Sequence, residues 1–180
     1  MAVGFLGSMI PCSSGQALQT VPSVDLGRYS GRWYEVARYP NRFQEACLSD
    51  VTAEYVIRDA NSLSVVNRCT TESGQTDKVV GIARVTDPQT NAKLEVRFAP
   101  AWLAWLPFVW GDYWIIDLAK NYTYAVVGEP SRRYLWILAR KPRLSHGVHA
   151  TITARLKAQG YDARRLIRTR HRKAAKELTE

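Results

Sequence analysis

The stretch Gly31-Arg32-Trp33-Tyr34-Glu35 opens a run rich in aromatic and β-branched residues. The run continues as Val36-Ala37-Arg38-Tyr39 and ends at Pro40-Asn41. A run of aromatic and β-branched residues that ends at Pro-Asn is typical of a β-strand. Just before it, residues 24–30 predict a single helical turn, with Asp25 placed to cap that turn. We therefore expect the first strand of a sheet to follow directly on a short helix.

The indole of Trp33 lies close to the start of this predicted domain and needs a packing partner. Far downstream, residues 134–140 predict a strand that ends in a cation, Arg140. A guanidinium stacked on a Trp face is a favourable pair when it is partly desolvated. We expect Arg140 to cover Trp33, so that the two residues form a structural pair that closes the last main strand onto the first.

Short alternating segments fill the region between these two strands. They predict strands at residues 51–58, 63–68, 78–85, 93–98, 113–118 and 124–128. Eight short strands with short turns and no interleaved helix favour an up-and-down antiparallel arrangement, although the pattern alone also fits a sandwich. Ser145 then predicts the start of a helix, with Val148, Ile152 and Leu156 on one stripe and Gly160 at its end.

Three motifs in this order resemble the signature regions of the lipocalins. They are Gly31-Arg32-Trp33-Tyr34-Glu35, Gly111-Asp112-Tyr113-Trp114 and the strand-terminal Arg140. The resemblance covers residues 24–168 and is strongest to the bacterial outer-membrane branch, which is also similar to apolipoprotein D. The middle motif has Gly111 where its commoner form, Thr-Asp-Tyr, has Thr. This departure fits the bacterial branch. The resemblance implies an all-β, eight-stranded up-and-down antiparallel barrel with a C-terminal α-helix packed outside, with room for one small ligand.

The length of 180 residues fits one domain, and the net charge of +9 is concentrated near the C-terminus. We predict an export signal or lipoprotein-type segment at residues 1–23, a lipocalin domain at 24–168 and a basic tail at 169–180. Basic tails can bind nucleic acid or an anionic membrane surface. Clustered like charges, however, favour a solvated end, so no nucleic-acid partner is expected.

The N-terminal segment leaves two processing routes open. Residues 3–10 are apolar like the core of an export signal, but no Lys or Arg precedes them. Cys12 is a candidate for lipidation after cleavage, although Pro11 fits that pattern poorly, and cleavage after Ala17 is the alternative. The resemblance implies a place in the cell envelope, in the outer membrane or the periplasm.

Two further cysteines lie in strand-rich sequence. Cys47 follows the first strand and Cys69 ends the third, so an up-and-down sheet places both at one end. A disulfide between them is sterically plausible in an oxidising compartment, and two free, semi-buried thiols are the alternative.

Catalytic and metal-binding patterns are weak. The three histidines, His146, His149 and His171, lie beside no plausible nucleophile and lack a metal-ligand spacing. We expect surface histidines, no metal, no cofactor and no enzymatic activity.

Alternation instead marks side chains that face into the barrel, where each either fills the core or contacts a ligand. The candidates for ligand contact are Tyr55, Ile57, Asn67, Val96, Phe98, Tyr113, Ile115 and Trp136. Asp117 has the same inward parity as Tyr113 and is a candidate to bind a head group or a neighbouring side chain. Arg38, Asn67 and Arg97 are further candidates for head-group contact near the open end.

An unusually long apolar connection spans residues 100–110 and contains Trp102, Trp105 and Phe108. Such a loop suits a bilayer interface or a partner, including a second copy, and equally suits a lid over the cavity. The resemblance to the lipocalins implies a lipid-binding protein, monomer or homodimer, that holds a fatty acid or lysophospholipid for storage or transport in envelope maintenance. The alternative is a structural or partner-binding protein that acts through this loop.

Overall fold

The structure is a computed structural model that describes residues 17–99, 106 and 109–172. Its sheet runs through β1 (Gly31–Arg38), β2 (Cys47–Asp59), β3 (Ser62–Thr71), β4 (Thr76–Val85), β5 (Lys93–Arg97), β6 (Gly111–Leu118), β7 (Tyr124–Gly128), β8 (Leu135–Ala139) and β9 (Ile167–Arg168). The helices are α1 (Leu26–Tyr29) and α2 (His146–Ala158), with short 3-10 helices η1 (Arg42–Gln44) and η4 (Ala163–Arg165).

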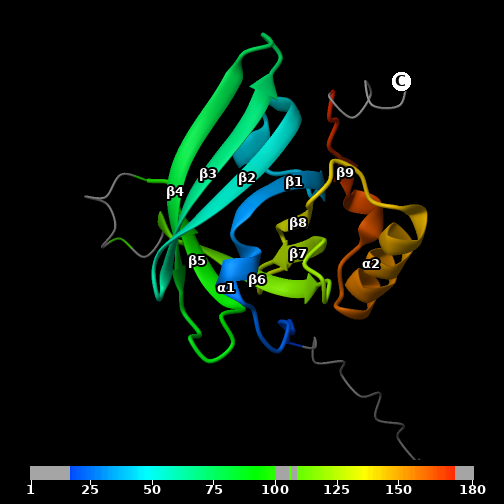
Figure 1. Cartoon of the computed structure of the whole chain (residues 1–180). Helices are drawn as coiled ribbons and strands as arrows, with labels where there is room; N and C mark the ends of the chain where they lie inside the picture. Colours follow the sequence, from blue (N-terminus) through cyan, green and yellow to red (C-terminus); the bar gives the residue numbers. More distant parts are fainter. Residues whose placement is uncertain (1–16, 100–105, 107–108, 173–180) are drawn as a thin grey trace, which may run out of the picture.

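The first eight strands form a closed antiparallel barrel (Figure 1). Each strand from β2 to β8 pairs with its neighbour in the chain, and β1 pairs with both β2 and β8. The predicted up-and-down barrel is therefore confirmed, and closure leaves the sheet without free edges where these pairings hold.

The short helix α1 lies at one end of the barrel, here called the closed end. Asp25 caps it by accepting a hydrogen bond from the backbone N–H of Arg28 at 3.1 Å. The indole N–H of Trp33 donates to the carbonyl of Tyr29 at 2.7 Å, which ties the helix to β1. Gly31 joins helix and strand at a φ of +89°, a conformation that favours glycine over any residue with a Cβ.

The opposite end, here called the mouth, carries Cys47, the β3–β4 turn and Gly111. The β3–β4 turn is at the top of Figure 1. Because β1 runs toward the mouth and β2 away from it, the loop between them also lies here.

Two apolar clusters bury the faces of the sheet. The inner cluster fills the barrel and includes Trp33, Ala53, Leu94, Ile115 and Leu138. The outer cluster lies between α2 and the strands it covers, and Ile152 and Leu156 of the helix are buried in it. The side chain of Ser145 caps α2, and Gly160 follows its end at a φ of +82°. The predicted C-terminal helix packed outside the barrel is confirmed (Figure 1).

Residues 167–172 lie between β1 and β2, where these two strands separate toward the mouth. This place is called the C-terminal seam. Strands β1 and β2 pair only from Gly31 to Tyr34, and β9 then takes the place of β2 beside β1. Thr169 donates its backbone N–H to Val36 at 3.0 Å, and the carbonyl of Arg170 accepts from Asp50 at 2.7 Å. The backbone of residues 169–172 of the predicted basic tail thus lies between two strands, while Arg170 and Arg172 remain exposed.

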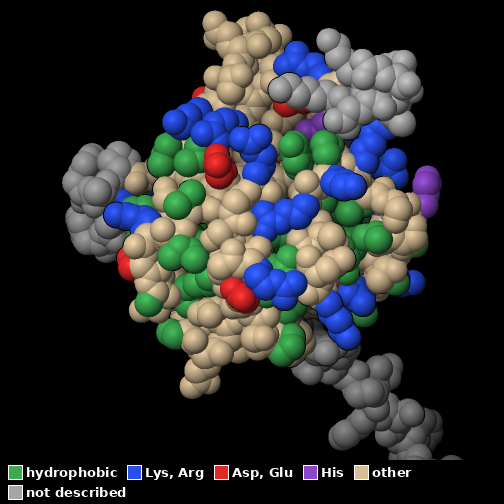
Figure 2. Space-filling view, in the orientation of Figure 1, with side chains coloured by type: hydrophobic (Ala, Val, Ile, Leu, Met, Phe, Trp, Pro, Cys, Tyr) green, Lys and Arg blue, Asp and Glu red, His purple; other side chains and the backbone are tan. Residues whose placement is uncertain are grey.

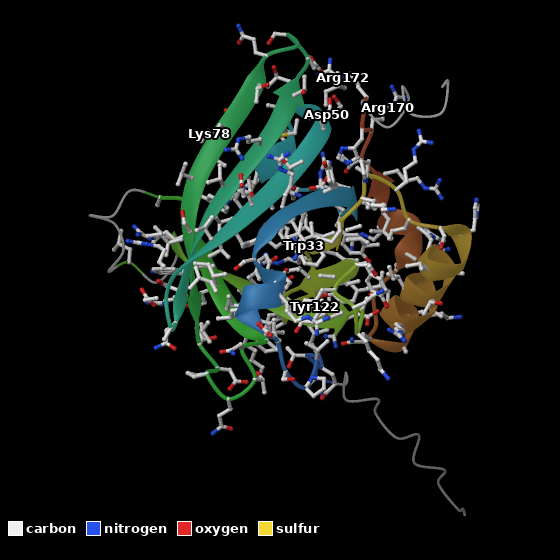
Figure 3. All side chains as sticks on the ribbon, in the orientation of Figure 1. Trp33, Asp50, Lys78, Tyr122, Arg170 and Arg172 are labelled. Carbon is white, nitrogen blue, oxygen red and sulfur yellow. A yellow bond between two sulfur atoms is a disulfide. The ribbon has the colours of Figure 1, made fainter. Side chains whose placement is uncertain are left out.

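Side chains reinforce this seam. Arg172 donates through Nε to Asp50 at 2.8 Å and through Nη2 to Thr70 at 2.8 Å, so that Asp50 and Arg172 lie together beside the end of the segment (Figure 3). Elsewhere on the face drawn in Figure 2, Lys and Arg side chains are spread among hydrophobic ones.

Within the described part of the chain, no helix has the length and apolarity needed to cross a membrane.

Candidate ligand-binding site

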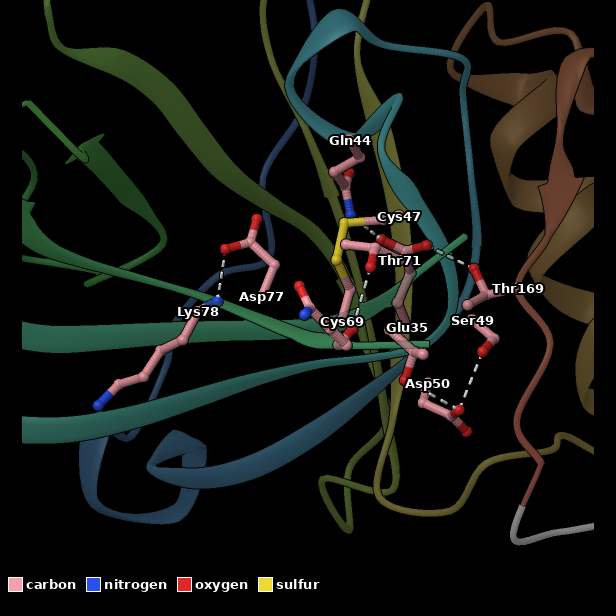
Figure 4. The surroundings of a disulfide bond; sticks show 12 residues. Glu35, Gln44, Cys47, Ser49, Asp50, Cys69, Thr71, Asp77, Lys78 and Thr169 are labelled. Carbon is pink, nitrogen blue, oxygen red and sulfur yellow. Dashed lines mark hydrogen bonds between the residues drawn. A yellow bond between two sulfur atoms is a disulfide. The ribbon is translucent and has the colours of Figure 1, made fainter. Parts of the chain in front are cut away.

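The mouth is braced by a disulfide between Cys47 of β2 and Cys69 of β3, whose Cα atoms are 5.5 Å apart (Figure 4). Both cysteines lie where these strands reach the mouth, so the bond holds the start of β2 against β3. Of the two states that the sequence left open, the structure has the disulfide.

Inward side chains near the mouth are less completely buried than those in the middle of the barrel. Tyr55 and Ile115 are buried in the inner cluster. Val96, Tyr113 and Trp136 pack against the same cluster but remain partly exposed, and they lie nearer the mouth. The lower barrel is therefore filled by its own side chains, whereas the upper interior is reachable from outside.

Asn67 belongs to this upper set. It stands opposite Ala53, a member of the inner cluster, and opposite Val79, which is 42% exposed. Its side-chain oxygen is buried and has no hydrogen-bond partner within the described residues. A polar atom in this state is costly unless a ligand or water satisfies it.

A polar network connects β1, η1 and β8 at the mouth. Glu35, only 2% exposed, accepts hydrogen bonds from Arg38 at 2.9 Å and from Gln44 at 2.6 Å. Trp136 donates its indole N–H to the side-chain oxygen of Gln44 at 2.8 Å, and Thr169 donates its hydroxyl to Glu35. The buried charge of Glu35 is thus paired with a guanidinium, as a buried carboxylate requires.

Arg38 retains one unused donor in this network. It stands opposite Trp136 across the β1–β8 pairing, so both side chains face the upper interior. Its Nε atom is buried without a hydrogen-bond partner among the described residues. A ligand head group that accepts hydrogen bonds would find this donor at the mouth.

Three tyrosines meet below the mouth. The hydroxyl of Tyr113 lies 2.7 Å from the hydroxyl of Tyr29 and 2.7 Å from that of Tyr55. Burial raises the pKa of all three phenols, for Tyr55 to about 12 despite its hydrogen bond with Tyr113. They are therefore neutral at physiological pH.

Two predicted contact residues, Ile57 and Arg97, lie away from this interior, whereas Phe98 lies at its edge. Ile57 is 46% exposed near the β2–β3 turn, beyond the level at which Tyr55 pairs with Gly31 of β1. Phe98 lies just past the end of β5, where it is 40% exposed and its ring covers the inward face of Gly81, which stands opposite Val65. Arg97 occupies the face of β5 opposite to Val96 and stacks at 5.2 Å on the ring of Trp110, so it does not point at a head group inside the barrel.

The inward parity predicted for Asp117 is wrong. A β-bulge between Ile115 and Asp117 shifts the register by one residue, so Asp117 pairs with Val126 of the outer cluster. Its carboxylate accepts a hydrogen bond from Arg155 of α2 at 2.7 Å. The acid therefore anchors the helix on the outside of the barrel.

A groove of about 470 Å³ lies on the outer side of β3 and β4, next to Phe98. Its lining includes Arg58, Ser64, Val80 and Ile82, which alternate with inward residues such as Val65 and Ala83.

Several predicted residues lie outside the described part of the chain. They are Cys12 and the loop residues Trp102, Trp105 and Phe108, so their suggested roles remain predictions. Within residues 17–99, 106 and 109–172, no three His, Cys, Asp or Glu side chains are grouped in a way that could hold a metal ion.

Three residues of the interior, Tyr29, Glu35 and Gln44, were not predicted from the sequence. Tyr29 precedes Trp33 by four residues, and this spacing at a helix end was an available signal for contact between the rings. Gln44 lies in the β1–β2 connection, and nothing in its local sequence indicates that it reaches Trp136.

Solved structures with the same fold confirm the architecture. Insecticyanin from the tobacco hornworm Manduca sexta superposes with a TM-score of 0.68 at 20% identity, covering 89% of this chain and 87% of that one. Apocrustacyanin C2 gives a TM-score of 0.66 at 16% identity, covering 83% and 81%. At these identities the likeness concerns the fold alone.

Sequence relatives are considerably closer. Outer membrane lipoprotein Blc of Escherichia coli K12 is 36% identical over 163 residues, 88% of each chain. Temperature-induced lipocalin-1 of Arabidopsis thaliana is 35% identical over 154 residues, 84% of this chain and 82% of that one. Mouse apolipoprotein D is 28% identical over 155 residues, 82% of this chain and 77% of that one. The family model of the lipocalin-like domain matches residues 24–171, and the chain belongs to this family.

Proposed function

We propose that this protein binds a small amphipathic lipid, a fatty acid or a lysophospholipid, in the upper interior of its barrel. The observation that carries this proposal is the incomplete burial of Val96, Tyr113 and Trp136, which face inward yet stay partly exposed. Apolar side chains in this state gain free energy when an acyl chain covers them, at about 0.8 kcal/mol for each buried CH₂ group.

The polar rim supports an amphipathic rather than a purely apolar ligand. The Nε atom of Arg38 and the side-chain oxygen of Asn67 both lack partners among the described residues. An anionic head group near the mouth would accept from Arg38, and a hydroxyl of a lysophospholipid head would donate to the oxygen of Asn67, while the acyl chain points toward the closed end. The mechanism is binding without bond making.

We further propose that the protein works in the cell envelope, in lipid storage or transport. The support is the similarity to relatives named outer membrane lipoprotein Blc. Lipidation of Cys12 belongs to this proposal, and it is tested by acyl labelling of the wild-type protein against Cys12→Ser expressed in the same host.

Filling the upper interior tests the binding proposal. Val96 stands opposite Gly111, which has no side chain, so Val96→Trp places an indole where the acyl chain would lie. Val56, which stands opposite Ser64 and is 54% exposed, gives the matched control Val56→Trp on the outer face. We expect displacement of a fluorescent fatty acid to show affinity at least tenfold weaker for Val96→Trp and unchanged for the control. Equal affinity in all three proteins would count against binding in the upper interior.

A further inference from the structure

The tyrosine trio, defined here as Tyr29, Tyr55 and Tyr113, brings three hydroxyl groups from separate elements to one point in the barrel. Tyr29 comes from α1, Tyr55 from β2 and Tyr113 from β6. Tyr29 and Tyr55 are 2% and 4% exposed, and Tyr113 is partly exposed. Two hydroxyl–hydroxyl contacts of 2.7 Å join them through the oxygen of Tyr113.

The three hydroxyl groups of the trio carry one more hydrogen than their two contacts use. Each phenol carries one O–H hydrogen, and its oxygen can accept two hydrogen bonds. The two contacts use two of the three hydrogens, and the described residues offer the trio's hydroxyls no other acceptor. Whichever way the hydrogens are arranged, one O–H donor is left over. Because a buried donor without a partner is unfavourable, the trio is incomplete without water or a ligand oxygen.

The spare donor is best placed on Tyr113. If Tyr29 and Tyr55, the two more deeply buried phenols, both donate to its oxygen, the free hydrogen belongs to the partly exposed residue. Counted from the mouth, Tyr113 also carries the first inward side chain of β6, because Gly111 has none. The trio therefore forms the floor that the leading end of an inserted ligand would meet.

The surroundings select a neutral acceptor. Among the described residues, the only charged side chain that shifts the pKa of any phenol in the trio is Arg140. The guanidinium of Arg140, whose charge acts on Tyr29, is already committed to the Trp33 ring and to backbone carbonyls. A carboxylate brought to this floor would lose its hydration without gaining a counter-ion, whereas a carbonyl oxygen needs only the one donor available.

We infer that the ligand carries a neutral carbonyl oxygen on the end that enters the barrel first, and that this oxygen accepts the spare hydrogen bond of the tyrosine trio. The inference rests on the proposed function, because it specifies the ligand of the same interior. Two sources offer this chemistry: a lipid oxidised to a ketone near its tail end, or a lipid with a neutral ester head that enters head first.

Calorimetric titration with three matched lipids tests the inference. The probes are hexadecanoic acid, 15-oxohexadecanoic acid and methyl hexadecanoate, which carry no inserted carbonyl, a tail ketone and a neutral ester head. The variant combines Tyr29→Phe, Tyr55→Phe and Tyr113→Phe, which keeps the shape of the floor and removes every hydroxyl together with its partners. Tyr34→Phe is the control, since the ring of Tyr34 packs edge-to-face against His171 outside the trio.

For each protein, the preference is the ratio of its affinity for a carbonyl lipid to its affinity for hexadecanoic acid. We expect this ratio to be about tenfold larger in the wild type than in the triple variant, because one hydrogen bond contributes roughly that factor. Tyr34→Phe should match the wild type. A gain confined to the ketone supports a tail-end carbonyl, and a gain confined to the ester supports head-first entry. The carbonyl stretch of the favoured lipid should lie at lower frequency in the wild type than in the triple variant.

The same preference in both proteins would overturn the inference and leave the proposed function standing. Failure of all three lipids to bind the wild type would overturn the proposed function and the inference with it.

Discussion

The guanidinium of Arg140, at the end of β8, lies 3.8 Å from the ring centre of Trp33 in β1. Its nitrogens donate to the carbonyls of Arg32 at 2.8 Å, Arg28 at 2.6 Å and Ser30 at 2.9 Å. One side chain therefore caps the indole and satisfies the carbonyls where α1 ends and β1 begins. The pair fixes the closed end of the barrel, including α1, which carries Tyr29 of the tyrosine trio.

Replacing Arg140 should destabilise the fold more than its partial exposure suggests. We expect Arg140→Ala to lower the free energy of unfolding by about 2–4 kcal/mol, because it removes charged hydrogen bonds and a cation–π contact. Arg140→Lys should recover less than half, since an ammonium cannot reproduce the planar fork. Urea unfolding measures both, with the exposed Arg164→Ala as a control that changes stability by less than about 0.5 kcal/mol. Equal effects at Arg140 and Arg164 would refute the structural role.

The disulfide should stabilise the folded state by restricting the unfolded chain. Cys47 and Cys69 are separated by 22 residues, and closing a loop of this size contributes about 3 kcal/mol in the chain-entropy model. We expect Cys47→Ser combined with Cys69→Ser to lose about 2–4 kcal/mol. A reductant should destabilise the wild type and leave the double variant unchanged. A wild type insensitive to reduction would show that the bond does not form.

Acid should weaken the C-terminal seam through Asp50. Burial alone would raise the pKa of Asp50, but hydrogen bonds from Arg172 and Ser49 outweigh it and hold the pKa below its usual value. A carboxyl with a lowered folded-state pKa stabilises the fold above its unfolded pKa of about 3.9 and loses that contribution as the pH falls below it. The urea midpoint of the wild type should therefore fall more steeply below about pH 4 than that of Asp50→Asn. Parallel profiles would contradict this assignment.

Alkali should act on the tyrosine trio. Burial raises the folded-state pKa of Tyr55 to about 12 and raises those of Tyr29 and Tyr113 well above 10, whereas unfolded phenols titrate near 10. Stability from a raised pKa is complete below the unfolded value and is lost as the pH rises through the folded one. We expect the wild type to lose more stability between about pH 10 and 12 than the triple Phe variant, measured by urea unfolding. An identical loss would place these phenols in contact with solvent.

The sequence was sufficient to predict the barrel. It was also sufficient to predict contacts between residues that lie in, or next to, clearly recognisable strands. Alternation located β2 to β8, although β2 begins at Cys47 rather than at residue 51. The Gly31–Glu35 motif and the cation at the end of β8 were enough to pair Trp33 with Arg140, because each lies at a predictable strand end. Up-and-down order likewise placed Cys47 and Cys69 at one end.

Side-chain direction was less predictable, for a physical reason. Alternation assumes an unbroken pleat, and a single bulge reverses the face of every later residue. The bulge after Ile115 turned Asp117 outward, and the one after Glu35 turned Ala37 outward and Arg38 inward. The seam filled by β9 and the contacts of the tyrosine trio depend on tertiary packing between distant segments, which local patterns do not encode.

The central claim is that the upper interior holds one lipid, and native mass spectrometry of the protein purified from its own host tests it most directly. Our account predicts a co-purifying acyl lipid at about one per barrel, which solvent extraction removes and added fatty acid or lysophospholipid restores. A folded barrel that emerges empty and refuses both added lipids would contradict the account, since the inward side chains would then be packed core alone.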